Sequence, residues 1–397
     1  MMLAITSRTD DAIRVLRPLF DDAEPDALGE TLVGAAAVLA RAFMLGSEPL
    51  LSLRWADPAL RLSEAAGDAR TVADVLITKG CSLADLGRTQ EGLILVRGGT
   101  ALATAGGFVR EEIRGATNLS MVLMRSDPRE GMELAIIGHE RARDLGLRAE
   151  QAVLLMNAGE CGLECGELEW FERTISQTDT DGWPDELLWY PTLSTVLLRA
   201  VRGRHDEARE LLDSNAGVIA RAEDAQGEVW HTETIVELAR GAAESSSDLA
   251  LGGQATGTIN ENRFAALCIG AHAAAWLRDA ERLDRSVKML RELALGESAE
   301  LFIRSFEATR ELIPGSDPDA VRASTAALSG IRRTSARFQL ALHEIDVIHA
   351  LGPDHPASAT LAAEARGIFE QMGSPSFLDR LDDALRIEIQ APAEAQS

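Results

Sequence analysis

The chain has 397 residues, of which 39 are Lys or Arg and 63 are Asp or Glu, so its formal net charge is −24 at pH 7. Apolar residues make up 46% and charged residues 26%, which is the composition of a folded globular protein and not of a disordered one. Aromatic residues make up only 4%, so we expect a core built from Leu, Val, Ile and Ala. The acidic charge argues against general binding to nucleic acid or to an anionic membrane, because both attract a positive surface.

The first residues do not form a secretory signal, because Met1 to Ile5 are apolar but lack a basic start and a longer apolar stretch. The best membrane candidates, 33–46 and 265–277, are shorter than the roughly 20 residues that cross a bilayer. Four cysteines are too few for a disulfide scaffold in so long a chain. We therefore expect a soluble, cytoplasmic protein.

Asp followed by Pro marks three expected helix starts, because the Asp side chain caps free amide groups and Pro fits the first turn. The three pairs are Asp57-Pro58, Asp127-Pro128 and Asp317-Pro318. Apolar residues such as Val72, Val75 and Leu76 recur at helical spacing. No convincing period-2 alternation bounded by hairpin turns occurs, so the sequence predicts an all-α fold.

Three pairs of glycines share one spacing: Gly92 and Gly131, Gly99 and Gly138, and Gly107 and Gly146 all lie 39 residues apart. Small residues fit where two helices approach closely, and the last pair fits helix ends that need left-handed backbone. The spacing predicts two copies of a helix-pair repeat with a period near 39 residues.

Two later segments, 202–212 and 278–283, are typical of turns that enter a helix. Ser245–Ser247 and Gly252–Gly257 form a small polar cluster, which predicts a loop or insertion at 241–260. We therefore expect helical repeats over 1–240, further repeats with a C-terminal cap over 261–389, and a disordered tail over 390–397.

The repeat resembles the tetratricopeptide (TPR) repeat. Asn118-Leu119-Ser120 and Asn157-Ala158-Gly159 resemble the Asn-Leu-Gly step of its first helix, and Glu91-Gly92, Glu130-Gly131 and Glu207-Ala208 resemble the Glu-Ala step of its second. The resemblance implies an antiparallel helix-pair solenoid that winds into a right-handed superhelix. The period near 39 departs from the family's about 34 residues, and Trp170-Phe171 replaces a residue that is small in the family.

Segments 154–160 and 365–381 resemble the C-terminal helical regions of bacterial multidomain regulators. Those regulators carry an ATPase module together with a class III adenylate or guanylate cyclase or a LuxR-type helix-turn-helix. The chain ends soon after Leu385, which favours the cyclase-type arrangement or a stand-alone relative. The resemblance implies a protein-binding, regulatory module in a signalling or transcription-regulatory system.

The catalytic motifs of such regulators are missing from the sequence. The two lysines, Lys79 and Lys288, do not follow glycine, which excludes the phosphate-binding loop of an ATPase. Cys161 and Cys165 would supply half of a zinc site, but no second pair completes it, and we favour buried small apolar side chains. We therefore expect no catalytic residues, no metal and no cofactor.

Four residues are candidates for binding a ligand in the groove. Asn118 and Asn157 occupy matched positions of successive first helices, either as structural hydrogen-bond donors, which we favour, or as a polar ladder facing a ligand. Trp189 and Tyr190 belong to an aromatic cluster that starts at Trp183, which is either a binding patch or a helix entry filling a gap.

These observations favour a non-catalytic module that binds a protein or peptide partner in a concave groove, with no nucleic acid and no membrane as partner. The alternatives are a helical domain that senses a small effector and, third, an all-helical enzyme of unrecognised type. The sequence does not identify the partner.

Overall fold

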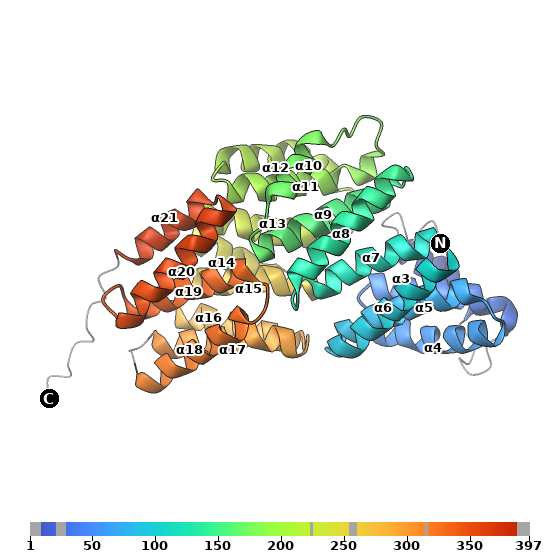
Figure 1. The fold of residues 1–397 in the computed structure, drawn as a ribbon, viewed down its shortest axis with the longest axis horizontal. Helices are drawn as coiled ribbons and strands as arrows, with labels where there is room; N and C mark the ends of the chain where they lie inside the picture. The colour runs from blue at the N-terminus through green and yellow to red at the C-terminus, as the bar shows by residue number, and fades with distance from the viewer. Residues whose placement is uncertain (1–8, 21–28, 223–224, 254–259, 314–316, 387–397) are drawn as a thin grey trace.

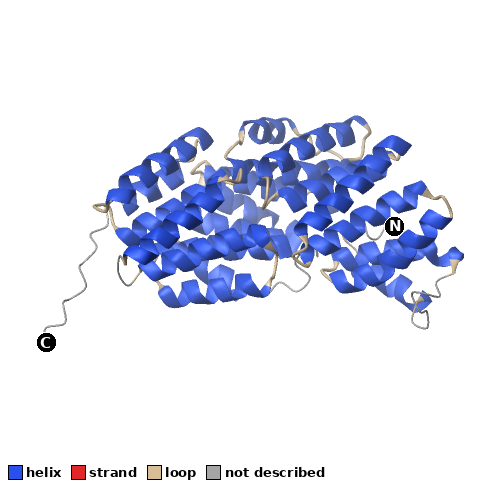
Figure 2. Cartoon of the chain, turned by 60° about the horizontal axis from the view of Figure 1, so that its bottom comes forward, coloured by secondary structure: helices blue, strands red, loops and turns tan. Residues whose placement is uncertain are grey.

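The computed structural model describes residues 9–20, 29–222, 225–253, 260–313 and 317–386. All regular structure in these ranges is helical and no strand occurs in them, which confirms the predicted all-α class (Figure 2). The twenty α-helices of these ranges are α2 Thr9–Leu16, α3 Val33–Leu45, α4 Pro49–Ala65, α5 Ala69–Asp85, α6 Thr89–Gly106, α7 Val109–Leu123, α8 Pro128–Asp144, α9 Arg148–Cys165, α10 Glu169–Gln177, α11 Trp189–Val201, α12 His205–Ile219, α13 Ala225–Ala239, α14 Ala243–Gly252, α15 Asn260–Trp276, α16 Ala280–Glu292, α17 Glu297–Leu312, α18 Pro318–Arg332, α19 Arg337–Leu351, α20 Pro356–Met372 and α21 Pro375–Ala384. Three short 3-10 helices, Arg17–Leu19, Glu30–Leu32 and Asp185–Leu187, complete the set.

The helices pack in two rows. From α3 onward almost every helix contacts its neighbour in sequence, and the odd-numbered helices from α3 to α21 also contact one another in succession. We call α3, α5, α7 and the following odd-numbered helices the inner row, and the even-numbered helices from α4 to α20 the outer row. The array runs from the N-terminal helices at the right of Figure 1, through α10, α11 and α12 at the top, to α19, α20 and α21 at the left.

Successive helices of the inner row start at similar intervals along the chain. Helices α5, α7, α9 and α11 start at Ala69, Val109, Arg148 and Trp189, so their starts are almost evenly spaced. Gly107 and Gly146 follow α6 and α8 with φ of +68°, which confirms the left-handed helix ends expected of this glycine pair.

The predicted close contacts at Gly92 and Gly131 are also confirmed. A Cβ atom on Gly92 would lie 2.5 Å from the carbonyl oxygen of Gly80, so α6 crosses α5 backbone against backbone. A Cβ atom on Gly131 would lie 3.0 Å from both the Ser120 carbonyl oxygen and the Cys161 Sγ. Glycine at these positions therefore sets how closely the helices approach.

The inner row is the most buried part of the molecule. In α19, 14 of the 15 residues are buried, and α19 packs on α9 and α15 as well as on its sequence neighbours. Helix α21 likewise contacts α11. One apolar core consequently extends from Leu155 in α9 to Ala384 in α21, whereas the N-terminal helices hold smaller separate clusters.

Two of the three expected Asp-Pro helix starts are confirmed and one is wrong. Asp127 and Asp317 are the N-caps of α8 and α18. Asp57-Pro58 instead lies inside α4, which already starts at Pro49. The buried face of α4, which includes Trp55 and Ala59, keeps the helix continuous through Pro58.

The loop expected at 241–260 is wrong over Ala243–Gly252, which form α14. Small polar residues can build a helix where neighbours accept their hydroxyl groups: Ser246 is buried, and its hydroxyl donates to the Thr234 carbonyl oxygen at 2.9 Å. Residues 254–259 and the expected tail at 390–397 lie outside the described ranges.

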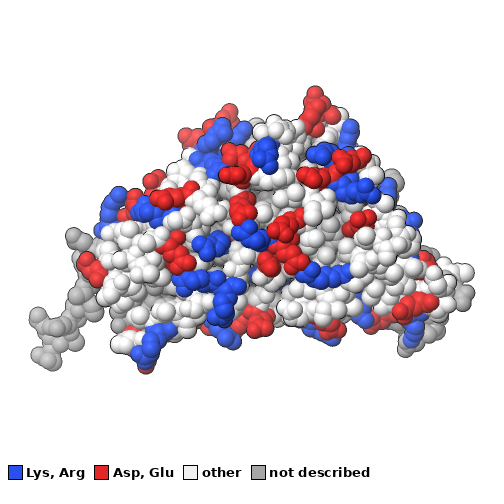
Figure 3. All heavy atoms as spheres, viewed as in Figure 1, with Lys and Arg blue, Asp and Glu red and all other residues white. Residues whose placement is uncertain are grey.

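No helix in the described part of the chain is both long enough and apolar enough to span a membrane. Acidic and basic side chains are interspersed over the face shown in Figure 3, despite the large negative net charge.

Candidate functional site

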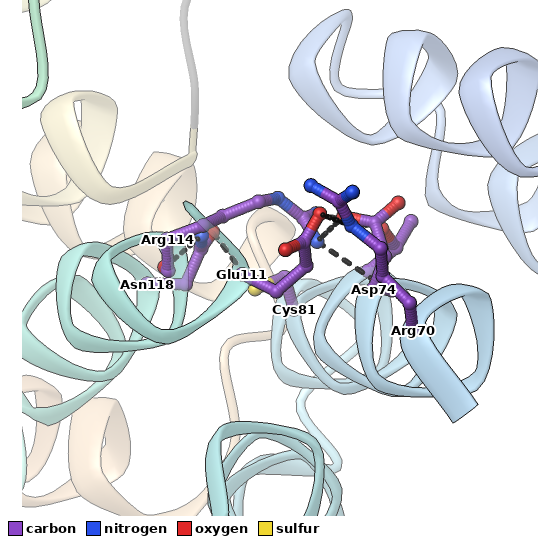
Figure 4. Close-up of polar contacts among 7 residues, drawn as sticks. Arg70, Asp74, Cys81, Glu111, Arg114 and Asn118 are labelled. Atoms are coloured by element: carbon purple, nitrogen blue, oxygen red, sulfur yellow. Dashed lines mark hydrogen bonds and ion pairs between the residues drawn. The ribbon is translucent and has the colours of Figure 1, made fainter. Parts of the chain in front are cut away.

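Asn118 lies at a buried contact between α5 and α7 (Figure 4). Its side-chain Nδ2 donates to the Arg114 carbonyl oxygen at 2.8 Å, and its Oδ1 accepts from the Cys81 thiol at 3.1 Å. Asn157 on α9 donates to the Thr117 carbonyl oxygen at 3.1 Å and to the Ser120 hydroxyl at 2.9 Å. Both asparagines thus hold neighbouring helices of the inner row together.

An arginine crosses the same contact. The Arg114 guanidinium reaches from α7 to the Asp74 carboxylate at 2.7 Å and to the Thr78 hydroxyl at 2.6 Å (Figure 4). Nearby, Arg70 on α5 pairs with Glu111 on α7 at 2.9 Å. Because each arginine pairs with a carboxylate on the other helix, this cluster fastens α5 to α7.

The predicted aromatic cluster is divided in the structure. Trp189 is buried, 2% exposed, and its ring stacks on Tyr190 at 3.7 Å between ring centroids. Trp183 instead lines a surface cleft, which neither Trp189 nor Tyr190 lines.

That cleft has a volume of about 520 Å³ and lies between α8, α9, α10 and the loop after α10. Trp170 and Trp183 line it with aromatic surface, Arg143 and Arg173 contribute cationic groups, and Glu140 and Asp179 contribute carboxylates. His139 forms part of the wall, 5.4 Å from Trp170 and edge-on to it. Indole rings suit a planar ligand, and the two arginines and two acidic residues could pair with groups of either charge on it.

His139 is fixed in one tautomer. Its Nδ1 donates to the Gln151 carbonyl oxygen at 3.1 Å, so Nε2 is left as an acceptor. Burial lowers the pKa of His139, which keeps the ring neutral near pH 7. His139 is only 1% exposed, so it supports the cleft wall and offers little polar surface to a ligand.

Inside the inner row lies a second group of polar residues, which the sequence did not reveal. At its α9–α13 end, Glu160 faces Glu228 and His231, with 3.8 Å between Glu160 Oε1 and His231 Nδ1. Asn262 on α15 donates to Glu228 at 2.8 Å. Burial raises the pKa of Glu160 to about 7, and burial together with Glu160 raises the pKa of Glu228 well above its usual range.

The group continues from α9 to α19 and α15. The Gln339 side chain donates to Glu164 at 3.0 Å and accepts from His272 Nε2 at 3.1 Å. His272 Nδ1 lies 2.7 Å from Asp346. Burial raises the pKa of Glu164 to about 7. Although burial opposes it, His272 and His343 hold the pKa of Asp346 below its usual value.

We call these residues the interior polar chain: Glu160, Glu164, Glu228, His231, Asn262, His272, Gln339, His343 and Asp346. Two sets of three within it bring their ligand atoms within 4.8 Å of one another, His272 with His343 and Asp346, and Glu160 with Glu228 and His231. Since the interior polar chain is enclosed by helices, its residues can hold protons or a metal ion but offer little surface to a substrate.

The four cysteines are buried, and all carry thiols of low reactivity. Burial raises the pKa of Cys81 and Cys165 to about 12 and that of Cys161 and Cys268 well above its usual value. Cys161 contacts the Ser120 carbonyl oxygen at 3.6 Å, the place of a small buried side chain, as expected.

Two sequence patterns correspond to parts of the interior polar chain. His272 is the one titratable residue in the apolar stretch 265–277 apart from Cys268, and Glu228-Val-Trp-His231 places an acid and a histidine on one helix face. Neither pattern is distinctive by itself, because the partners of each residue lie on other helices, far away along the chain.

Neither a scan against protein-family models nor a search of curated proteins finds a match for this sequence. Its function must therefore be inferred from its own residues and their geometry.

Proposed function

We propose that the chain is a non-catalytic, TPR-like module that binds a protein or peptide partner and regulates it. The observation that carries the proposal is the packing of successive inner-row helices, each paired with a helix of the outer row. The nearly even spacing of the starts of α5, α7, α9 and α11 supports a repeat with the period of the glycine pairs. A right-handed superhelix belongs to the same proposal.

The resemblance of 154–160 and 365–381 to bacterial regulators favours a partner of the ATPase or nucleotide-cyclase type in the cytoplasm. Gly92 and Gly131 lie at matched helix contacts, which is consistent with the close helix crossings of a TPR-like repeat. Asn118 and Trp189 are buried and engaged within the chain, so the proposed partner surface does not depend on them.

Regulation of such a partner can be measured directly. The purified chain is added to a class III nucleotide-cyclase domain or to an ATPase domain, and turnover is followed as the chain is titrated. A saturable change in rate, with binding confirmed by calorimetry, supports the proposal. The chain by itself is expected neither to hydrolyse ATP nor to form cyclic nucleotide. Turnover by the chain that disappears with one substitution in it would contradict the non-catalytic assignment.

The surface cleft favours a second candidate function, the sensing of a small effector. Its two tryptophans match a planar ring and its two arginines can pair with phosphate, while Glu140 and Asp179 can accept from amino groups, so ATP and cyclic AMP are practical probes. Thermal stabilisation by either probe, lost in Trp170→Ala and kept in Trp55→Phe, which changes a tryptophan outside the cleft, would support it. If neither the partner domain nor the probes bind, neither function holds.

A further inference from the structure

Two histidines and a carboxylate from helices far apart in sequence meet inside the interior polar chain. His272 comes from α15, and His343 and Asp346 lie one helical turn apart on α19. Asp346 Oδ2 is 2.7 Å from His272 Nδ1 and 3.6 Å from His343 Nδ1. All three side chains are fully buried.

We propose that His272, His343 and Asp346 bind one divalent transition-metal ion of the Zn²⁺ class between α15 and α19. Imidazole nitrogen and carboxylate oxygen bind Zn²⁺ at about 2.0–2.2 Å, so neighbouring ligand atoms in a tetrahedral site lie about 3.3 Å apart. The two separations from Asp346, 2.7 and 3.6 Å, lie on either side of that value. Small side-chain shifts would complete the geometry.

The far sides of two ligands are held as in protein metal sites. His272 Nε2 donates to the Gln339 side-chain oxygen at 3.1 Å, which holds the ring in place. The ion would replace the hydrogen that Nδ1 shares with Asp346 Oδ2 at 2.7 Å and would release it as a proton. Asp346 Oδ1 accepts from the Trp276 ring at 2.8 Å, which leaves Oδ2 for the ion. Each contact fixes a ligand in the orientation that binding requires.

His343 lacks the hydrogen bonds that a buried imidazole normally makes. Neither ring nitrogen makes one with any described residue, and Nδ1 has only the long 3.6 Å approach to Asp346. Leaving a buried polar nitrogen unbonded is unfavourable. Coordination of Nδ1 to a metal ion would remove that cost at one of the two nitrogens.

The charges around the cluster also match a divalent cation. Asp346 and Glu164 are joined through Gln339 and His272, and no Lys or Arg in the described ranges forms an ion pair with either carboxylate. One ion of charge +2 bound at Asp346 would neutralise that carboxylate. Buried carboxylates are stable when paired or metal-bound, so the cation fits the site electrostatically.

The surroundings indicate a structural role for the ion. The Phe306 ring lies 4.4 Å from His343 and 4.8 Å from His272, and Phe302 stacks on His343 at 6.0 Å between ring centroids. These rings close the site to substrates. The ion would cross-link α15 to α19, which α16, α17 and α18 separate along the chain, and so stabilise the fold.

The test uses the full chain without a histidine tag. After incubation with Zn²⁺ and passage over a chelating resin, mass spectrometry is expected to find about one zinc per chain. Zinc should raise the melting temperature, and X-ray absorption should show nitrogen and oxygen neighbours, including imidazole, without sulfur.

Variants locate the ion. His343→Gln and Asp346→Asn are expected to lose the bound zinc, whereas His139→Gln, a buried histidine elsewhere, keeps it. Trp276→Phe removes only an outer contact and should weaken zinc affinity by about 10- to 100-fold. Glu228→Gln, in the other candidate cluster, should leave the zinc content unchanged.

Three results would overturn the proposal: no zinc retained by the folded wild-type chain, sulfur among the neighbours, or zinc lost in Glu228→Gln and kept in His343→Gln. If His343→Gln does not fold, the absorption spectrum of the wild-type chain and the Trp276→Phe affinity decide the question.

Discussion

At the scale of single residues, buried polar side chains act as fasteners between inner-row helices. Asn157 joins α9 to α7, Arg114 joins α7 to α5, and Gln339 joins α19 to α9. A buried hydrogen bond contributes modestly when made, but leaving one partner unsatisfied costs about 1–3 kcal/mol. These contacts therefore specify which helix faces meet, more than they add net stability.

Gly131→Leu should destabilise the protein by about 1–3 kcal/mol, because a side chain there would overlap Ser120 and Cys161. Gly98→Leu is the matched control, since a Cβ on this helical glycine meets nothing within 4 Å. The control should be neutral or gain up to about 1 kcal/mol from helix propensity. Chemical denaturation compares the two, and equal effects would contradict the packing assigned to Gly131.

Stability should depend on pH through Glu160, whose pKa burial raises from 4.5 to about 7. The folded chain then holds this proton more tightly than the unfolded chain, so the contribution is full below about pH 4.5 and is lost as the pH rises through about 7. Glu228, His231 and Glu164 are the titratable groups that act on it directly or through one another.

Glu160→Gln, which resembles the protonated acid, should therefore flatten the fall in melting temperature between about pH 5 and pH 7. Glu186→Gln changes an exposed carboxylate and serves as the control. If the wild-type melting temperature instead rises over this interval, and the melting temperature of Glu160→Gln does not change with pH, then Glu160 is ionised in the folded protein.

At the scale of helices, side chains at the helix ends make several of the hydrogen bonds that hold the helices in place. The Asp127 side chain caps α8 by accepting from the Glu130 amide at 3.3 Å, and it also accepts from the Ser335 hydroxyl at 2.8 Å, before α19. Asp317 caps α18 through the Asp319 amide at 2.9 Å. One cap is thus local, whereas the other also joins segments that are distant in sequence.

Asp127→Ala should cost more stability than Asp317→Ala. Loss of an N-cap costs about 0.5–2 kcal/mol, and Asp127→Ala additionally removes the partner of the Ser335 hydroxyl. In combination with Ser335→Ala, the cost of Asp127→Ala should fall towards that of Asp317→Ala. Additive effects of the two substitutions would show that the Asp127–Ser335 contact contributes nothing.

At the scale of the whole molecule, the array closes on itself. A Cβ on Gly87, after α5, would lie 2.3 Å from the Ala294 carbonyl oxygen, so this turn rests on the segment between α16 and α17. Arg125 pairs with Glu261 on α15 at 2.9 Å in a buried contact. Such contacts bring N-terminal and C-terminal helices together, beyond the neighbour contacts of an open repeat array.

The C-terminal helix docks through the end of α11. Arg202 donates to the Gly373 carbonyl oxygen at 2.9 Å, and the Ser374 hydroxyl donates to the Val201 carbonyl oxygen at 2.7 Å. These bonds satisfy carbonyl groups at two helix ends, which otherwise lack partners.

Arg202→Ala should therefore speed amide exchange in both α11 and α21, although these helices lie far apart in sequence. The control Arg204→Ala removes an exposed pair with Glu207 and should leave the free energy of unfolding almost unchanged. Faster exchange confined to α11 in Arg202→Ala would mean that α21 is held without this contact.

Local chemistry was predictable where each residue's role depends on near neighbours. Left-handed helix ends at Gly107 and Gly146 and the caps at Asp127 and Asp317 follow from backbone geometry close by in the chain. The helix start predicted at Asp57-Pro58 was wrong because the burial of α4 against α3 and α5 outweighed the local start signal.

By itself, the sequence determined the all-α class, the close contacts at Gly92 and Gly131, and the places where several helices begin and end, because spacing along one chain reports these directly. Only the tertiary structure decided that Trp183 lines the cleft, apart from Trp189 and Tyr190, and that the side chains of His272 and Asp346 are in contact. Those meetings depend on how distant helices cross when the array closes, and no periodicity along the chain encodes the distance between two side chains on separate helices.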